Sequence, residues 1–114
     1  MKKIGNMEIY EDYVLLSINP SVYHIDLVYN AAYVLLEKAY VVLDGDPKSE
    51  IIVDIRPKNV GISPEELGNA FNSELINQAV YKQHAEKNAA IRQAMIQRAL
   101  LTNGILPKND KDSS

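Results

Sequence analysis

Side chains able to do chemistry are few in this sequence, and they are scattered along it. The chain has two histidines, His24 and His84, and no cysteine. A metal ion needs several ligands in a fixed geometry, and neither histidine has a second ligand four residues away on a helix. Asp44, Asp46 and Glu50 offer oxygen ligands at nearly alternate positions, but their connector is about half as long as a calcium-binding EF-hand loop. We therefore expect no metal ligands and interpret the connector as a turn.

Paired carboxylates at Glu65 and Glu66 could serve acid–base chemistry only in a water-poor pocket. They stand in the first turn of a predicted helix, where attraction to the positive end of the helix dipole accounts for them. The five glycines are scattered, and none opens a helix after a strand in the spacing of a phosphate-binding loop. No serine has the context of a nucleophile elbow. The sequence therefore predicts no catalytic residue, no cofactor and a protein that is not an enzyme.

The stretch from Ser63 to Thr102 dominates the elements that would position any site. Ser63 and Glu66 have the spacing of a capping box, in which each side chain bonds to the other residue's free backbone N–H. Pro64 suits the first helical position, because a residue there has no use for its N–H. We therefore expect Ser63 and Glu66 to be structural polar residues that begin a helix at Pro64.

The length of this stretch predicts that it bends. A single helix over it would extend roughly 58 Å at about 1.5 Å per residue, whereas a compact domain of this size has a radius of gyration of only ~13 Å. The apolar pattern is also interrupted by a polar run before it resumes. We therefore expect two helices, over residues 64–86 and 89–102, with a bend near residues 81–90 and Asn88 as the second N-cap.

Two polar residues in these helices have two possible roles. Asn77 lies in the middle of the first helix, where asparagine has a mediocre propensity, and Arg92 lies on the apolar stripe of the second. A polar group that faces a core needs a partner or costs about 1–3 kcal/mol. Either both residues bond inside the fold and fix how the helices dock, or both face a partner protein.

Upstream of this stretch the pattern alternates between the periods of strands and helices. Alternating apolar residues predict a strand over residues 8–19, and a period near 3.6 predicts a helix over residues 22–38. Two further strands, over 40–43 and 50–56, flank a turn-forming connector and make a hairpin. The residues predicted to share the buried face of the first helix are Ile25, Val28, Tyr29, Ala32, Leu35, Leu36 and Ala39.

The resulting order β-α-β-β-α-α predicts an α+β fold. A helix between the first two strands lets them run parallel, and the third can then pair antiparallel with both if it lies between them. We therefore expect a three-stranded sheet in the order 2-3-1, covered by helices on one face and open at both edges. Residues 8–102 form the single domain, between a frayed N-terminus at 1–7 and a disordered tail at 103–114.

Composition and charge limit the classes of partner. The 114 residues are 46% hydrophobic and 24% charged, which suits one domain with a modest core. No apolar run approaches the ~20 residues of a membrane span and no signal peptide is apparent, so we expect a cytoplasmic protein. Residues 8–54 contain nine acidic and two basic side chains, a charge of −7, so the remainder carries +4 in a total of −3. This argues against nucleic acid and suits either a basic partner or a solvated acidic face.

One run within the long helical stretch resembles a family signature. Residues 75–83 read Leu-Ile-Asn-Gln-Ala-Val-Tyr-Lys-Gln. The run resembles Leu-Leu-Asn-Asp-Tyr-x-Leu-Arg-Glu, roughly the C-terminal signature of the HxsD family, the small D protein of His-Xaa-Ser peptide-modification systems. Positions that match outright or in kind are Leu75, Ile76, Asn77 and Lys82, and positions that depart are Gln78, Ala79, Tyr81 and Gln83. The resemblance continues over Ala90-Ile91-Arg92, Gln97-Arg98-Ala99, Ala32-Tyr33 and residues 39–57.

The resemblance implies a role in maturing a ribosomally made peptide. Similar family members are encoded beside two radical-SAM-type proteins and a substrate with His-Xaa-Ser repeats, so the chain would be an accessory protein that binds the precursor peptide or docks on a radical SAM protein. Two alternatives remain: an obligate homodimer without a ligand, built by the C-terminal helices, and a small hydrolase-like enzyme. A peptide could pair with the first strand as an open edge, or a partner could meet a second apolar face of the long helix. The partner-binding residues predicted on these surfaces are Tyr10, Tyr13, Leu15, Ser17, Ile76, Asn77, Val80 and Tyr81.

Overall fold

A computed structural model describes the backbone of residues 1–103 and the side chains of residues 1–97. The chain divides into two compact units, of which the first is Met1–Val80 and the second begins at Tyr81. The first unit is an α+β domain containing one sheet, the helix α1 (Ile25–Leu35) and the start of the helix α2 (Pro64–Asn103). The single domain expected over residues 8–102 stays a prediction.

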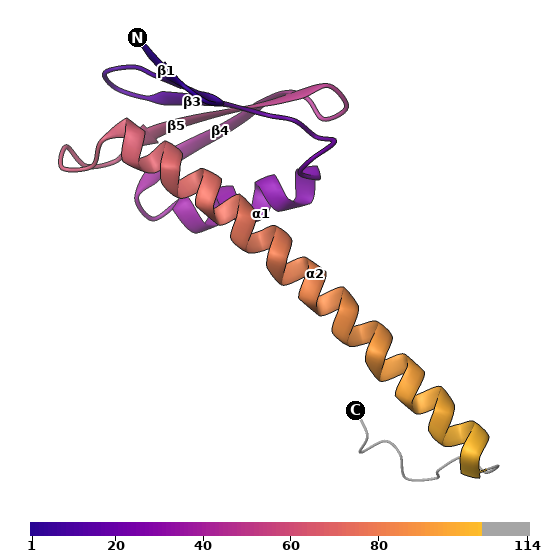
Figure 1. The fold of residues 1–114 in the computed structure, drawn as a ribbon. Helices are drawn as coiled ribbons and strands as arrows, with labels where there is room; N and C mark the ends of the chain where they lie inside the picture. The colour runs from indigo at the N-terminus through magenta and orange to yellow at the C-terminus, as the bar shows by residue number, and fades with distance from the viewer. Residues whose placement is uncertain (104–114) are drawn as a thin grey trace. The chain divides into compact units, whose positions relative to one another are not determined.

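Five antiparallel strands form one sheet in the order β1-β2-β3-β5-β4 (Figure 1). Their bounds are β1 Lys2–Ile4, β2 Met7–Ile9, β3 Val14–Ile18, β4 Ala39–Asp46 and β5 Glu50–Pro57. The three strands expected from the sequence correspond to β3, β4 and β5, and β5 lies between the other two as predicted. The expectation of only three strands is wrong, because the N-terminal residues add two more.

The N-terminal hairpin accounts for this difference. Residues 1–7 were expected to be frayed, but they contain β1 and the first residue of β2. The chain reverses at Gly5, whose φ of 58° lies in the left-handed region that glycine adopts without a Cβ clash. The single strand expected over residues 8–19 is two strands, because the chain turns again between Ile9 and Val14 so that β2 pairs with β3.

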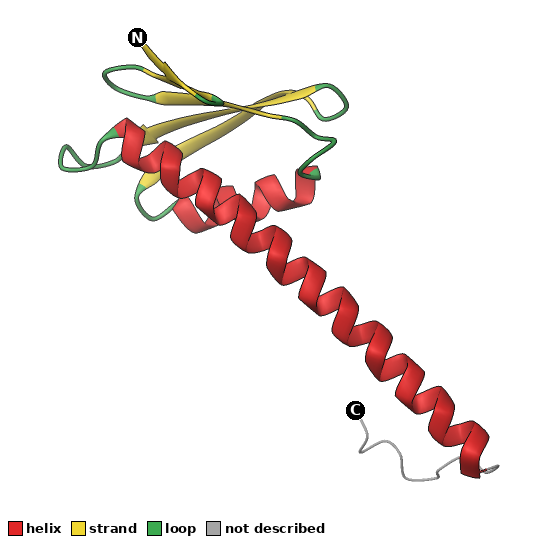
Figure 2. Ribbon diagram, viewed as in Figure 1, coloured by secondary structure: helices red, strands yellow, loops and turns green. Residues whose placement is uncertain are grey.

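Both helices lie on the same face of the sheet in the first unit (Figure 2). The N-cap of α1 is His24, whose Nδ1 accepts a hydrogen bond from the backbone N–H of Asp26 at 3.2 Å. Tyr29 and Leu36 were expected in the buried stripe of this helix, but both are exposed. The reason is that the helix is rotated about its axis relative to the orientation expected from the sequence. Its buried residues are Leu27, Val28, Ala31, Ala32 and Leu35.

The start of α2 is as predicted. Ser63 Oγ accepts from the N–H of Glu66 at 3.1 Å, and Glu66 Oε1 accepts from the N–H of Ser63 at 3.3 Å, which completes the capping box. Leu67, Phe71 and Leu75 follow at helical spacing and are buried against the sheet.

The expected interruption of the C-terminal helix is wrong. Helix α2 continues through residues 81–90 to Asn103, so the division into helices over 64–86 and 89–102 fails, and Asn88 is not an N-cap. No glycine or proline follows Gly68 within this helix, and Ala, Gln, Lys and Arg are good helix formers. The expectation had assumed that all of α2 packs into one compact domain. The tail predicted from residue 103 begins in this helix, and residues 104–114 lie outside the described part.

Candidate functional site

The face of the sheet opposite the helices has no helix over it within the first unit (Figure 2). Because strand side chains alternate between faces, the partners of buried residues on each strand point to this outer face. Tyr40 and Val42 of β4 are 61% and 59% exposed there, although both are large and apolar. The outward residues are Lys3, Glu8, Leu15, Ser17, Tyr40, Val42, Asp44, Asp46, Glu50, Ile52, Asp54 and Arg56. We call this set the outer face.

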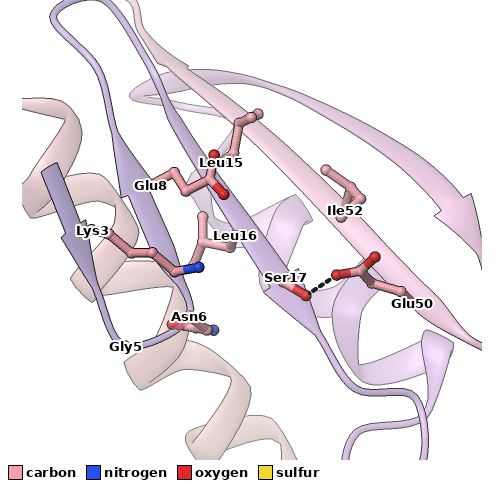
Figure 3. A pocket seen from close by; sticks show the side chains of 9 residues that line it. All are labelled: Lys3, Gly5, Asn6, Glu8, Leu15, Leu16, Ser17, Glu50 and Ile52. Carbon is pink, nitrogen blue, oxygen red and sulfur yellow. Dashed lines mark hydrogen bonds between the residues drawn. The ribbon is translucent and has the colours of Figure 1, made fainter. Parts of the chain in front are cut away.

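A shallow groove of about 340 Å³ crosses β1, β2, β3 and β5 on the outer face (Figure 3). Ser17 donates a hydrogen bond from Oγ to Glu50 Oε2, and Lys3 and Glu8 line the same groove. An activated serine needs a base that is itself oriented by a third group, and no histidine lines this groove. The arrangement is suited to binding a hydrogen-bond donor or a cation.

Two tyrosines and an arginine form a rigid cluster beside this groove. The rings of Tyr10 and Tyr13 are stacked with centroids 4.5 Å apart, and the guanidinium of Arg56 lies 4.4 Å from the centroid of Tyr13. Tyr10 donates a hydrogen bond to Glu8 Oε1 at 3.0 Å, and this bond is the main reason that the pKa of Tyr10 is raised. Arg56 also pairs with Asp54: its Nε lies 3.4 Å from Oδ1, and its Nη2 donates a hydrogen bond to Oδ2 at 3.5 Å. These contacts preorganise an aromatic and charged surface.

Four of the predicted partner-binding residues lie together in the structure, but not on an open edge of the sheet as expected. Tyr10, Tyr13, Leu15 and Ser17 all lie at or beside the outer face. Their strand, however, is not an open edge, because β3 pairs with β2 on one side and β5 on the other. A peptide cannot extend the sheet there, and the predicted edge-strand binding over Tyr10–Ile18 is wrong.

The edges of the sheet are β1 and β4 instead. Strand β1 is only three residues long and carries Lys2 and Lys3, which are the features that discourage pairing with another chain. Strand β4 is eight residues long, and its run Tyr40-Val41-Val42-Leu43 contains neither a charge nor a proline. The longer edge is therefore the less protected one.

The register of the β4–β5 ladder identifies which backbone groups of β4 are free. Lys58 donates its N–H to the carbonyl oxygen of Lys38 at 3.0 Å, and Pro57, which has no N–H, lies opposite Ala39. Hydrogen-bonded and non-hydrogen-bonded pairs alternate along an antiparallel ladder. The N–H and C=O groups of Ala39, Val41 and Leu43 therefore point away from β5, towards the open side of β4, whereas the N–H of Gly45 is already bonded to Asp44 Oδ1.

An aromatic stripe on α1 lies beside this edge. Tyr29, Tyr33 and Leu36 share one side of the helix and are 57%, 76% and 44% exposed. Lys58 connects the end of this stripe to β4, since its Nζ donates to the carbonyl oxygen of Leu36 at 2.7 Å and lies 5.2 Å from the ring centroid of Tyr40. We call Tyr29, Tyr33 and Leu36 the α1 stripe. The α1 stripe was not predicted from the sequence, because Tyr29 and Leu36 were expected in the core.

The remaining predicted site residues do not join the outer face. Ile76 and Val80 of the first unit are 54% and 44% exposed, and Tyr81 of the second is 74% exposed. Asn77 and Arg92 are both exposed, and a structural role for them in helix docking stays a prediction. Partner binding by these five residues stays a prediction.

Neither a metal-binding cluster nor a membrane-spanning helix occurs in the part of the chain that the structure describes. No group of three histidine, aspartate or glutamate side chains there is arranged to hold a metal ion. No helix in the same part of the chain combines the length and apolar character required to cross a membrane.

Comparison with known proteins identifies one family. The model of the family described as His-Xaa-Ser system protein HxsD matches residues 18–106, which is most of the chain. No curated protein and no solved structure matches it.

Proposed function

The chain belongs to the HxsD family of His-Xaa-Ser system proteins, and from that premise we propose that it is a non-catalytic accessory protein that binds an extended polypeptide segment of the system. The segment adds to the free edge of β4 as a further strand, the mode of recognition called β-augmentation. Backbone hydrogen bonds supply affinity, and side chains at alternate positions supply the choice of sequence. The precursor peptide is the proposed source of the segment.

The observation that carries this proposal is the unprotected edge of β4. Natural sheets protect long edges with charges, prolines, bulges or a covering element, because an open edge pairs with other chains. The residues Val41, Val42 and Leu43 have none of these side-chain protections, and Val42 is 59% exposed. A binding partner that covers the edge explains why such a run is retained.

The contacts of the outer face support a binding role over a catalytic one. Ser17 and Glu50 bond to each other, and Tyr10, Tyr13 and Arg56 are already engaged in a stacked cluster. Side chains held in this way offer a preformed surface, which lowers the entropic cost of binding a peptide. They include no base oriented towards a nucleophile by a third group.

An NMR titration tests the proposal. The ¹⁵N-labelled chain is titrated with a precursor peptide carrying His-Xaa-Ser repeats and, separately, with a radical SAM protein of the system. We expect the precursor to shift the amide signals of Val41 and Leu43 more than those of β1. Shifts at β4 with the radical SAM protein alone would reassign the segment to that protein. Binding of either partner that leaves both signals unmoved would exclude the β4 edge.

A second candidate function, self-association, is favoured by an observation in the second unit. All of residues 81–97 are exposed, including Ile91, Met95 and Ile96 at 49%, 66% and 44%. An isolated helix with no packing is marginally stable in water, so contact between two copies would stabilise this one. Sedimentation of the wild-type chain and of an Ile91→Ser/Met95→Ser variant tests this function. A dimer that the variant abolishes would support it, and a wild-type monomer at high concentration would exclude it.

A further inference from the structure

The β4 edge has different surroundings on its two sides, and this difference specifies the chemistry of the segment that it binds. On one side lies the α1 stripe, and on the other lie the acidic residues at the hairpin end of the outer face. We infer that the bound segment is amphipathic with a period of two, so that large apolar side chains meet the α1 stripe and basic side chains meet the carboxylates. This inference rests on the proposed function and adds the recognition rule of the same site.

The position of the α1 stripe follows from the packing of α1. Val34, Leu35 and Lys38 line a hollow together with Leu67 and Ala70, so α2 lies on the Val34 side of α1. At about 100° per residue, Tyr29 and Leu36 lie on roughly the opposite side of the helix from Val34. Helix α1 contacts β4, and Lys58 connects Leu36 of the stripe to Tyr40 of β4, so the stripe lies on the side of α1 away from α2 and next to β4.

Apolar and aromatic side chains of a partner suit this position. A further hollow, lined by Tyr33, Val34, Leu36 and Glu37, lies at the end of the α1 stripe. Exposed tyrosines give a large contact area at a low entropic cost, because few torsions become fixed on binding. A strand added to β4 places every second side chain beside Val41 and Leu43, on the helix side of the sheet.

The intervening side chains of the added strand lie on the outer face, next to Tyr40, Val42, Asp44 and Asp46. Asp44, Asp46 and Glu50 are three carboxylates on two neighbouring strands, and Lys48 in the turn is the only lysine or arginine from Asp44 to Glu50, whereas Asp54 is already paired with Arg56. Asp44 and Asp46 each use one oxygen on a turn N–H, at 2.7 and 2.9 Å, and a carboxylate can accept further bonds. Charge complementarity therefore favours lysine or arginine at these positions.

Three blocked octapeptides test the recognition rule on the whole chain. They are acetyl-(Val-Lys)₄-amide, its block isomer with four valines followed by four lysines, and acetyl-(Val-Glu)₄-amide. We expect the alternating basic peptide to bind at least about tenfold more tightly than the other two, with shifts at the amides of Val41 and Leu43. Equal affinity of the three peptides, or no binding of the alternating basic peptide at millimolar concentration, overturns the inference.

Variants assign the two sides of the surface. Tyr29→Ser/Tyr33→Ser removes the aromatic side, and Asp44→Asn removes one charge while retaining the acceptor for the N–H of Gly45. We expect each to weaken binding of acetyl-(Val-Lys)₄-amide by about threefold to tenfold. Val60→Ser is the control, since Val60 is a fully exposed apolar residue that belongs to neither the α1 stripe nor β4. Unchanged melting temperatures verify that the variants fold.

The failure of this inference is distinguishable from failure of the proposed function. If Val41→Pro blocks binding of the precursor while the tyrosine and Asp44 variants bind it normally, the edge is used but amphipathic recognition is wrong. If Val41→Pro binds the precursor as the wild type does, the proposed function itself fails. A dimer without peptide that Val41→Pro dissociates would make a second copy of the chain the occupant and overturn the inference.

Discussion

Gly68 of α2 lies directly against Met7 of β2: a Cβ atom on Gly68 would stand 2.5 Å from Met7 Sδ and 3.3 Å from Val14 Cγ2. Met7 is 3% exposed, so this contact forms part of the core. The close approach of helix and strand explains why the only glycine in α2 occurs at this position, at a cost in helix propensity.

Gly68→Ala is therefore expected to destabilise the chain. Overpacking costs about 1–3 kcal/mol, and the gain in helix propensity returns about 1 kcal/mol, so we expect a net loss of about 1 kcal/mol. In a Met7→Ala background the methyl group has room, and the same substitution should stabilise. Urea unfolding of the four chains measures both effects. An equal effect in the two backgrounds would contradict the contact.

The N-terminal hairpin shows where sequence reasoning reaches its limit. The alternation of Val14, Leu16 and Ile18 predicted a strand, because a period of two is a local property, and all three residues are buried in β3. Strands of three residues are too short for a periodic signal, so β1 and β2 were missed. Long-range contacts hold the hairpin, such as the paired hydrogen bonds of Asn6 with Asn72 at 3.0 and 2.9 Å. Their partners are 66 residues apart, and no local pattern predicts them.

Helix α1 illustrates the same limit for the candidate site. The helix itself was predictable, but the stripe of apolar residues was broad enough to permit more than one rotation. The rotation that the fold adopts buries Leu27 and Ala31 and exposes Tyr29 and Leu36. Because that choice depends on packing against a sheet, the α1 stripe became visible only in three dimensions.

The capping box makes a quantitative prediction. Ser63→Ala removes the acceptor of the Glu66 N–H and should destabilise the first unit by about 1 kcal/mol. Ser73→Ala is the matched control, because Ser73 is exposed inside α2 and alanine is the better helix former there. Thermal unfolding should therefore separate the two variants in opposite directions. Equal stability of the two variants would contradict the role of the cap.

The Tyr10–Glu8 hydrogen bond predicts a pH dependence. The pKa of Tyr10 is raised, chiefly by this bond, so in the folded state the phenol keeps its proton to higher pH than in the unfolded state. The contribution of the bond to stability is therefore complete below the unfolded pKa of about 10 and is lost as pH rises through the folded pKa. Ultraviolet titration, with Tyr10→Phe to assign the signal, should show that Glu8→Gln lowers the pKa of Tyr10. An unchanged titration in Glu8→Gln would contradict this cause.

The proposed binding of a basic segment at the β4 edge also predicts that its affinity depends on salt concentration. The screening length between exposed charges is about 8 Å at physiological ionic strength, and it becomes longer as the salt concentration falls. If Asp44 and Asp46 attract a basic segment, affinity should fall as salt rises, and the fall should be shallower in Asp44→Asn/Asp46→Asn. Calorimetric titrations at several salt concentrations measure the slope. Parallel slopes for the variant and the wild type would contradict an electrostatic role for these two residues.

The most direct test of the account compares Val41→Pro with Val41→Ala. Both variants remove the β-branched valine side chain, but only proline also removes the backbone N–H, which points away from β5, so the β4–β5 ladder is retained in both. The account predicts that Val41→Ala binds the precursor peptide within about threefold of the wild type, whereas Val41→Pro loses binding by at least about tenfold at a similar melting temperature. Equal affinity of the two variants for the precursor would contradict strand addition at β4.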